Sequence, residues 1–140
     1  MFDKSYVERL RLWRNFREHL ENATDPINDT IQFWSKAPLV NIATDPYDIE
    51  SWPDPWQMIL NNEYCDFVKI LAIFYTLQLT ERFNQSQFEI HIVLDRKESA
   101  IRYLLFVDNQ AIGYYNDKCI DKQELPPLQS QVQHNLLPRY

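Results

Sequence analysis

Apolar residues recur at three- and four-residue steps in several early segments of the chain, which is the spacing of an amphipathic α-helix. The first such segment is Tyr6–Leu20, where charged residues occupy the positions between the apolar ones. We expect two more helices, at Pro26–Ser35 and Pro55–Asn61. Each begins with a proline after an aspartate, and this order suits a helix start because aspartate can cap the free N–H groups.

The longest apolar segment covers residues 63–82. Bulky side chains occupy more than half of the circumference when this segment is drawn as a helix. A helix that is apolar on most sides is normally touched on most sides. The pattern therefore predicts a central helix, against which the rest of the domain packs.

The period changes to two after Phe88, where Ile90, Ile92 and Leu94 alternate with polar residues and one valine. This alternation is typical of a half-buried β-strand. We expect strands at residues 88–94, 101–107 and 111–115, joined by turns that are too short for parallel crossovers. The sequence thus predicts an α+β domain in which a three-stranded antiparallel meander packs on the central helix.

Two segments hold apolar residues that no regular element requires. Residues 38–56 are interrupted by four prolines, and residues 121–140 have little periodicity. We predict one globular domain over residues 1–120, with the proline-rich segment pinned to its surface, and an extended C-terminal tail over residues 121–140. The candidate binding residues in and near these segments are Trp52, Trp56, Leu125, Leu128, Leu136, Leu137 and Tyr140.

Composition removes several classes of function. The chain of 140 residues contains a single glycine, Gly113, so it cannot form the glycine-rich loops that cradle nucleotide phosphates. The formal net charge is −6, which argues against nucleic acid as a partner. The first segment is locally basic, but glutamates interrupt it, and we interpret it as a solvated helix face. We expect no cofactor.

Cysteine and histidine are sparse: the chain has two cysteines and three histidines without ligand-pair spacing, so we expect no metal site. No signal peptide is recognisable at the start, and no run of 18 apolar residues occurs. We therefore expect no membrane association, and free thiols from a reducing compartment.

Cys65 is the one candidate nucleophile, because it opens the central helix, where the helix dipole and free N–H groups favour a thiolate. A cysteine that opens a helix and is followed by antiparallel strands resembles the transglutaminase-like core, a branch of the papain-like cysteine enzymes. The resemblance covers about residues 63–116. It implies a histidine on the second strand and an aspartate on the third.

The sequence departs from that pattern at both partner positions. The histidine position falls near Ala100, and the nearest acid on the third strand, Asp117, comes one or two positions late. The remaining catalytic alternative is Cys65 with His91 and Asp95 from the first strand. Because the polar side of that strand should point away from the central helix, we interpret Cys65 as a core residue in a degenerate form of this core.

A second resemblance involves three stretches: Phe-Trp-Ser-Lys-Ala-Pro-Leu-Val at 33–40, Ser-Trp-Pro-Asp-Pro-Trp-Gln-Met-Ile at 51–59 and Tyr-Cys-Asp-Phe at 64–67. Together they are similar to small uncharacterised proteins of large tailed phages, notably marine and cyanobacterial ones. The resemblance implies a location in the virion or host cytoplasm. We expect a non-enzymatic structural or interaction subunit with protein partners. The alternatives are a thiol enzyme using Cys65, and an adaptor or inhibitor that binds a host protein.

Overall fold

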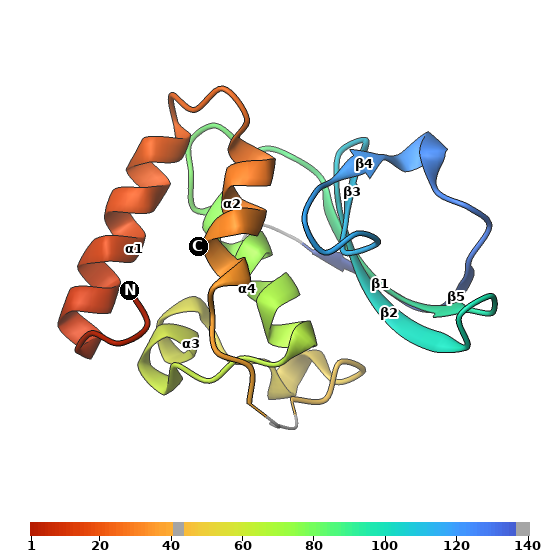
Figure 1. Cartoon of the computed structure of the whole chain (residues 1–140), viewed down its shortest axis with the longest axis horizontal. Helices are drawn as coiled ribbons and strands as arrows, with labels where there is room; N and C mark the ends of the chain where they lie inside the picture. The colour runs from red at the N-terminus through yellow and green to blue at the C-terminus, as the bar shows by residue number, and fades with distance from the viewer. Residues whose placement is uncertain (41–43, 137–140) are drawn as a thin grey trace.

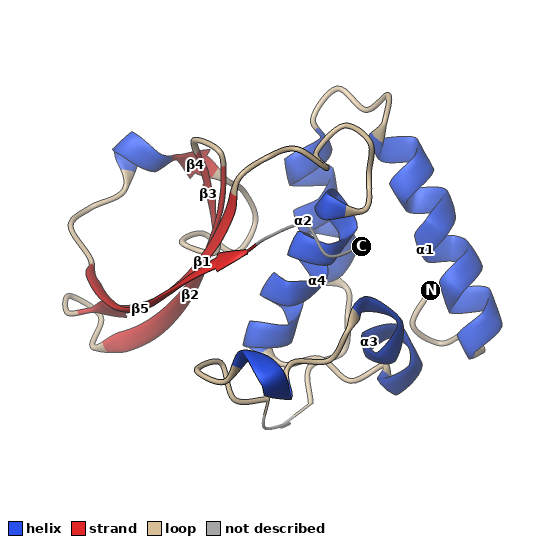
Figure 2. Ribbon diagram, turned by 180° about the vertical axis from the view of Figure 1, so that it is seen from behind, coloured by secondary structure: helices blue, strands red, loops and turns tan. Residues whose placement is uncertain are grey.

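The computed structural model describes residues 1–40 and 44–136, and these form a helical layer beside an antiparallel sheet (Figure 1). Figure 2 shows the same two layers from behind, with α4 lying between the other helices and the strands. The helices are α1 Tyr6–Leu20, α2 Pro26–Ser35, α3 Pro55–Asn61 and α4 Asp66–Gln78. The strands are β1 Phe88–Asp95, β2 Ala100–Val107, β3 Gln110–Ile112, β4 Ile120–Asp121 and β5 Gln129–Leu136.

The three helices predicted beside the central one, α1, α2 and α3, are confirmed at their predicted bounds. Local hydrogen bonds explain where α1 and α3 begin: the Ser5 side chain accepts from the Glu8 N–H, and the Asp54 carboxylate accepts from the Gln57 N–H. These bonds satisfy N–H groups that a first helical turn leaves free. The expected cap of α2 is not formed, because Asp25 makes no side-chain capping bond and only Pro26 marks its start. The α3 helix ends where Asn62 adopts a left-handed conformation, with φ of 51°.

The central helix is confirmed but shorter than predicted, covering Asp66–Gln78 rather than residues 63–82. Cys65 is extended, with φ of −117° and ψ of 177°, so the helix begins only after it. At the other end, the Glu21 carboxylate accepts hydrogen bonds from the N–H groups of Glu81 and Arg82. These bonds hold residues 81–82 against the end of α1, which draws them away from a continued helix.

The sheet has five strands in the order β4-β3-β2-β1-β5, which corrects the prediction of three. All pairs are antiparallel, and the β1–β2 register runs from Phe88 opposite Val107 to Asp95 opposite Ala100. Of the two added strands, β4 straddles the predicted start of the C-terminal tail and β5 lies wholly within it. The longer of them, β5, pairs with β1 along the edge opposite β2, so residues 129–136 fold back onto their own domain.

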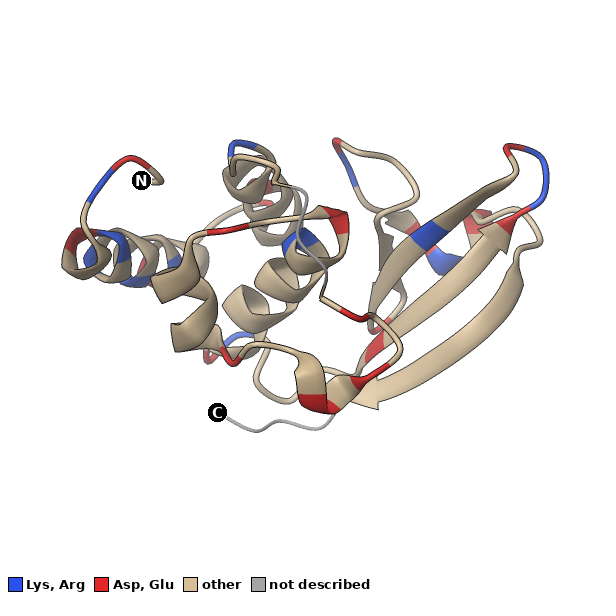
Figure 3. Ribbon diagram, turned by 90° about the horizontal axis from the view of Figure 1, so that it is seen from below, with Lys and Arg blue, Asp and Glu red and all other residues tan. Residues whose placement is uncertain are grey.

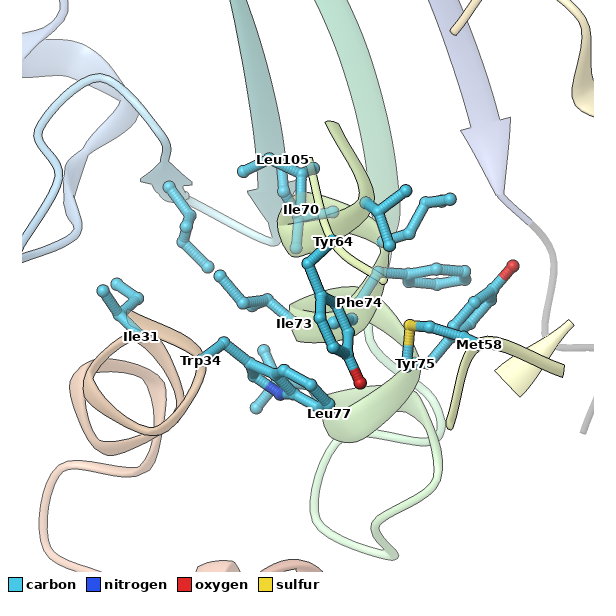
Figure 4. Packing of buried hydrophobic residues seen from close by; sticks show 14 of the residues in the cluster. Ile31, Trp34, Met58, Tyr64, Ile70, Ile73, Phe74, Tyr75, Leu77 and Leu105 are labelled. Atoms are coloured by element: carbon cyan, nitrogen blue, oxygen red, sulfur yellow. The ribbon is translucent and has the colours of Figure 1, made fainter. Parts of the chain in front are cut away.

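The sheet has two unlike faces. Phe88, Ile90 and Leu105 pack into the main core with α4, as Figure 4 shows for Leu105 above Ile70. The prediction that the central helix packs on the apolar face of the sheet is therefore confirmed. On the outer face, a second small cluster of Val93, Leu104, Phe106 and Ala111 is covered by partly buried residues that follow β3: Tyr114, Ile120, Leu125 and Leu128.

A single hydroxyl joins three helices in the main core. The indole N–H groups of Trp13 in α1 and Trp34 in α2 both donate to Thr76 Oγ1 in α4, each at 2.9 Å. The Thr76 hydroxyl in turn donates to the Ala72 carbonyl at 2.6 Å. One donor and two acceptor sites are all that a hydroxyl offers, so this group is saturated in the interior.

Replacing Thr76 by valine keeps the shape of the side chain and removes the acceptor of two buried indoles. We expect Thr76→Val to lower the free energy of unfolding by about 2 to 4 kcal/mol. Each buried indole N–H that loses its acceptor costs about 1 to 3 kcal/mol. Urea titration followed by circular dichroism measures the loss. The matched control is Thr30→Val, since Thr30 is equally buried but bonds only the Pro26 carbonyl. An equal loss in both variants would contradict the role of Thr76.

Candidate interaction groove

A groove of about 470 Å³ lies between the helical layer and the β2–β3 side of the sheet. The helices α2 and α4 form one wall and the strand residues form the other. Because α2 packs along α4, the wall is continuous across the two helices. The principal side chains of the helical wall are Ile31, Trp34, Asp66, Lys69, Ile70 and Ile73, and those of the strand wall are Ile101, Tyr103, Ile112 and Tyr115.

The rim of the groove carries exposed apolar side chains. Leu39, Ile101 and Tyr115 are 59%, 47% and 45% exposed, and all three line the groove. They come from three separate segments: the turn after α2, the start of β2 and the chain after β3. Scattered apolar residues on a surface are ordinary, but several around one concavity are typical of a binding site.

Gly113 shapes the strand wall. Its φ of +107° lies in a region that residues with a Cβ rarely adopt, and a Cβ placed there would lie 2.3 Å from the Tyr103 carbonyl oxygen. The chain therefore passes β2 more closely here than any other residue allows. It also ends β3 at Ile112, whereas the sequence predicted a strand over residues 111–115. The only glycine of the chain thus terminates the strand pairing at the groove.

Two charged side chains of opposite sign lie one helical turn apart on the α4 wall. The Asp66 side chain is exposed, and Lys69 Nζ lies 3.5 Å from the Ser35 carbonyl oxygen at the end of α2. Within the described residues, neither Asp66 nor Lys69 takes part in an ion pair. The groove therefore offers one carboxylate and one ammonium group to a ligand.

The three residues of the catalytic alternative are not brought together. Cys65 precedes α4 and packs against the main core, whereas His91 lies on the outer face of the sheet with its ring 4.6 Å from that of Phe106. The His91 ring pairs with Glu89 at 3.1 Å. Among the described residues no hydrogen bond or ion pair connects the Cys65 thiol to an imidazole. The sheet itself separates the two groups.

Asp95 has a structural role in the β1–β2 turn. Its carboxylate accepts from the N–H groups of Lys97 and Glu98 and pairs with the Arg102 guanidinium at 2.9 Å. The hydrogen bond from Arg102 is the main reason that the pKa of Asp95 lies below its usual range. These contacts close the hairpin, and none of them involves His91.

The remaining histidine of the sheet, His134 in β5, lies on the face toward α4. Its ring nitrogen is 3.1 Å from the Pro46 carbonyl oxygen, and its ring meets that of Trp52 edge-on at 5.1 Å. Trp52 also packs on Phe67 of α4. The proline-rich segment is therefore held to the domain through Trp52, as its apolar content predicted.

The predicted binding residues are mostly engaged within the domain. Trp52 and Leu136 pack against the main core, and Leu125 and Leu128 cover the outer cluster. Of the described ones only Trp56 is well exposed, at 43%. Leu137 and Tyr140 lie outside the described residues. The structure instead draws attention to Asp66, Lys69, Ile101 and Tyr115, which the sequence did not single out because they come from distant segments.

The basic first segment is an internally paired helix face. Arg11 pairs with Glu8 at 2.7 Å and Arg14 with Glu18 at 3.3 Å, and Figure 3 shows both signs of charge along α1. Arg9 is buried and donates to the Ile59 carbonyl of α3. The interpretation of this segment as a solvated face holds for the exposed arginines, while Arg9 ties α1 to α3.

A methyl group at position 113 would test how closely the backbone at Gly113 approaches the backbone of β2 at Tyr103. We expect Gly113→Ala to lower the free energy of unfolding by about 2 kcal/mol or more, because the strained φ and the clash with the Tyr103 carbonyl act together. Asn116→Ala, on the exposed part of the same segment, should change stability by less than about 0.5 kcal/mol. Chemical denaturation compares the two variants, and a Gly113→Ala variant as stable as Asn116→Ala would refute the constraint.

Removing the guanidinium of Arg102 should raise the pKa of Asp95 toward its usual range in Arg102→Gln. Because the pKa of Asp95 is lowered in the folded state, the pair stabilises the fold above the unfolded pKa and loses this contribution as pH falls through the folded pKa. Arg102→Gln should therefore be less stable than wild type at pH 7, and the difference should shrink below about pH 4. Carboxyl NMR titration and denaturation across pH measure both effects. A stability difference that does not vary with pH would contradict this assignment.

Among the described residues, no three His, Cys, Asp or Glu side chains form a group that could hold a metal ion. In residues 1–40 and 44–136, no helix has the length and apolar character needed to cross a bilayer. No protein-family model matches the chain, and no match is found among curated proteins.

Proposed function

We propose that this protein is a non-enzymatic interaction subunit that binds another protein through the groove between α2, α4 and β2. The observation that carries the proposal is the ring of exposed apolar side chains, Leu39, Ile101 and Tyr115, around a concavity of about 470 Å³. Apolar side chains that are exposed around a concavity gain free energy when a partner covers them. This groove replaces the C-terminal segment as the main binding surface, because β5 is part of the sheet.

The non-enzymatic part of the proposal is supported by the surroundings of Cys65. A thiol nucleophile needs a base within hydrogen-bond reach and a group that orients the base. The described part of the chain provides neither for Cys65, since His91 and Asp95 have other partners on the far side of the sheet.

The partner we propose is another component of a phage particle or of its assembly machinery. This context rests on the resemblance of residues 33–40, 51–59 and 64–67 to small proteins of large tailed phages. Part of the first stretch lines the groove, through Trp34 and Leu39. An adaptor that binds a host protein would use the same surface, so the identity of the bound protein distinguishes the two roles.

Photo-crosslinking in the cells that naturally contain the protein tests this proposal. We expect p-benzoylphenylalanine at position 115 to give a discrete crosslinked species, because Tyr115 stands on the rim of the groove. The control position is Val7, which is 71% exposed on α1 and does not line the groove. Mass spectrometry then identifies the partner as a particle component or a host protein. The proposal fails if positions 115 and 39 give no more crosslinking than position 7.

A further inference from the structure

The two edges of the sheet differ in length and in charge. Strand β4, at one edge, covers only Ile120–Asp121 and is followed by the charged turn Lys122–Glu124. Strand β5, at the other edge, covers eight residues, Gln129–Leu136, and contains no Asp, Glu, Lys or Arg. Figure 3 shows β5 as the outermost strand, without a charged residue. Short or charged edges resist pairing with another chain, whereas a long uncharged edge permits it.

The outer side of β5 is unpaired. Its strand partner is β1, and among the described residues no backbone hydrogen bond reaches β5 from any other segment. The proline-rich segment meets β5 on the face toward α4, where the Pro46 carbonyl contacts the His134 ring. Figure 2 shows no other described segment over the outer side of β5. Backbone groups that point away from β1 are therefore available to another strand.

The strand register determines which residues of β5 present these groups. The Gln87 carbonyl accepts a hydrogen bond from the N–H of the residue that follows β2, so the backbone of Gln87 points toward β2. Backbone groups alternate in direction along a strand, so those of Ile90 point toward β5 and meet His134 there. The backbone groups of the two neighbours, Gln133 and Asn135, therefore point away from β1.

A bulge limits the part of this edge that can pair. The β1–β5 register shifts between Ile92 and Val93, which leaves Gln131 as an extra residue in β5. A bulge bends its strand and interrupts the regular row of backbone groups. The regular stretch is therefore Val132–Leu136, which spans about 17 Å.

This stretch is complementary to a copy of itself. When two copies run antiparallel with His134 at the centre, Gln133 of each lies opposite Asn135 of the other, and about four backbone hydrogen bonds form. On the outer face, the Gln133 amide donates to Asn135 at 3.0 Å within one chain. An amide is both donor and acceptor, so it can also bond the same group of a second copy. On the inner face, the half-buried Val132 lies opposite the half-buried Leu136.

Charge favours a second copy of the chain as the occupant of this edge. The formal net charge is −6, so two copies repel each other over most of their surface. Pairing a strand with itself brings each side chain near its own copy, and like charges opposite each other destabilise a sheet. Because β5 has no charged residue, two copies can approach along it without this cost.

We propose that β5 pairs with β5 of a second copy of this chain, antiparallel and about a two-fold axis at His134, so that the two sheets join edge to edge. The groove lies on the β2–β3 side, so each protomer of the dimer keeps its own groove. The dimer therefore presents two equivalent binding sites. This inference goes beyond the proposed function and does not depend on it.

Sedimentation equilibrium of the purified full chain tests the dimer. We expect a monomer–dimer equilibrium with a dissociation constant between about 1 and 300 µM, because a short strand pair buries less area than a standard interface. A chain that remains monomeric up to about 1 mM overturns the inference.

Two matched double variants test the predicted register. Gln133→Glu with Asn135→Lys places opposite charges across the axis, so it should dimerise at least as tightly as wild type. Gln133→Lys with Asn135→Lys places like charges there and should weaken dimerisation at least tenfold. Both pairs of changes lie on the exposed outer face, and circular dichroism checks that the fold persists. Equal dissociation constants for the two variants overturn the inference.

Amide hydrogen exchange of the wild-type chain gives a readout that needs no variant. As the dimer forms, exchange at the N–H groups of Gln133 and Asn135 should slow, while Val132 and His134, which already face β1, should change little. A dimer without this protection uses another surface and overturns the inference. If the chain stays monomeric but crosslinks from position 115, only this inference fails. If it dimerises through β5 but gives no such crosslink, only the proposed function fails.

Discussion

The hydrogen bonds that meet at Thr76 fix the helical layer on which the rest of the structure depends. Two tryptophans from different helices share one hydroxyl, so α1 and α2 can move relative to α4 only by breaking buried bonds. Around this point Tyr64 packs against the Trp34 ring, as Figure 4 shows. Burial raises the pKa of the Tyr64 phenol and keeps it neutral there. Because α2 is fixed on α4, the two helices present one continuous wall to the sheet, and the groove has a rigid side.

The alternation of side chains between the two faces of β1 determines whether His91 can reach Cys65. Side chains at odd and even positions of a strand point to opposite faces, so Ile90 and His91 cannot both face α4. Ile90 packs in the main core, so the side chain of the next residue, His91, points to the outer face, where it pairs with Glu89. A histidine one position earlier or later would face the helix that Cys65 opens. The separation of thiol and imidazole is thus a consequence of packing the strand rather than of a local distortion.

Much of the fold could be predicted from the sequence because the strongest patterns are local. The helices α1, α2 and α3 have both an apolar period and a start signal. Strand β1 alternates with Val93 as the one exception, and β2 ends in an apolar run between two polar turns. The strand β5 was missed because only Val132, His134 and Leu136 mark its inner face and the positions between them are polar. A bulge between the partners of Ile92 and Val93 interrupts even that period. The groove was not predictable, since its walls join residues from α2, α4 and β2 that no spacing relates.

Gly113 determines both where strand β3 ends and where the groove begins. A longer β3 would continue along β2, and the chain would then not turn toward α2 at this point. The glycine ends the strand by adopting φ of +107° against the Tyr103 carbonyl, and the chain leaves the sheet toward Gln32 and Asn28. The departure ends the strand pairing and bounds the groove in one step. The one glycine of the chain thus lies at the position where the sheet stops and the groove begins.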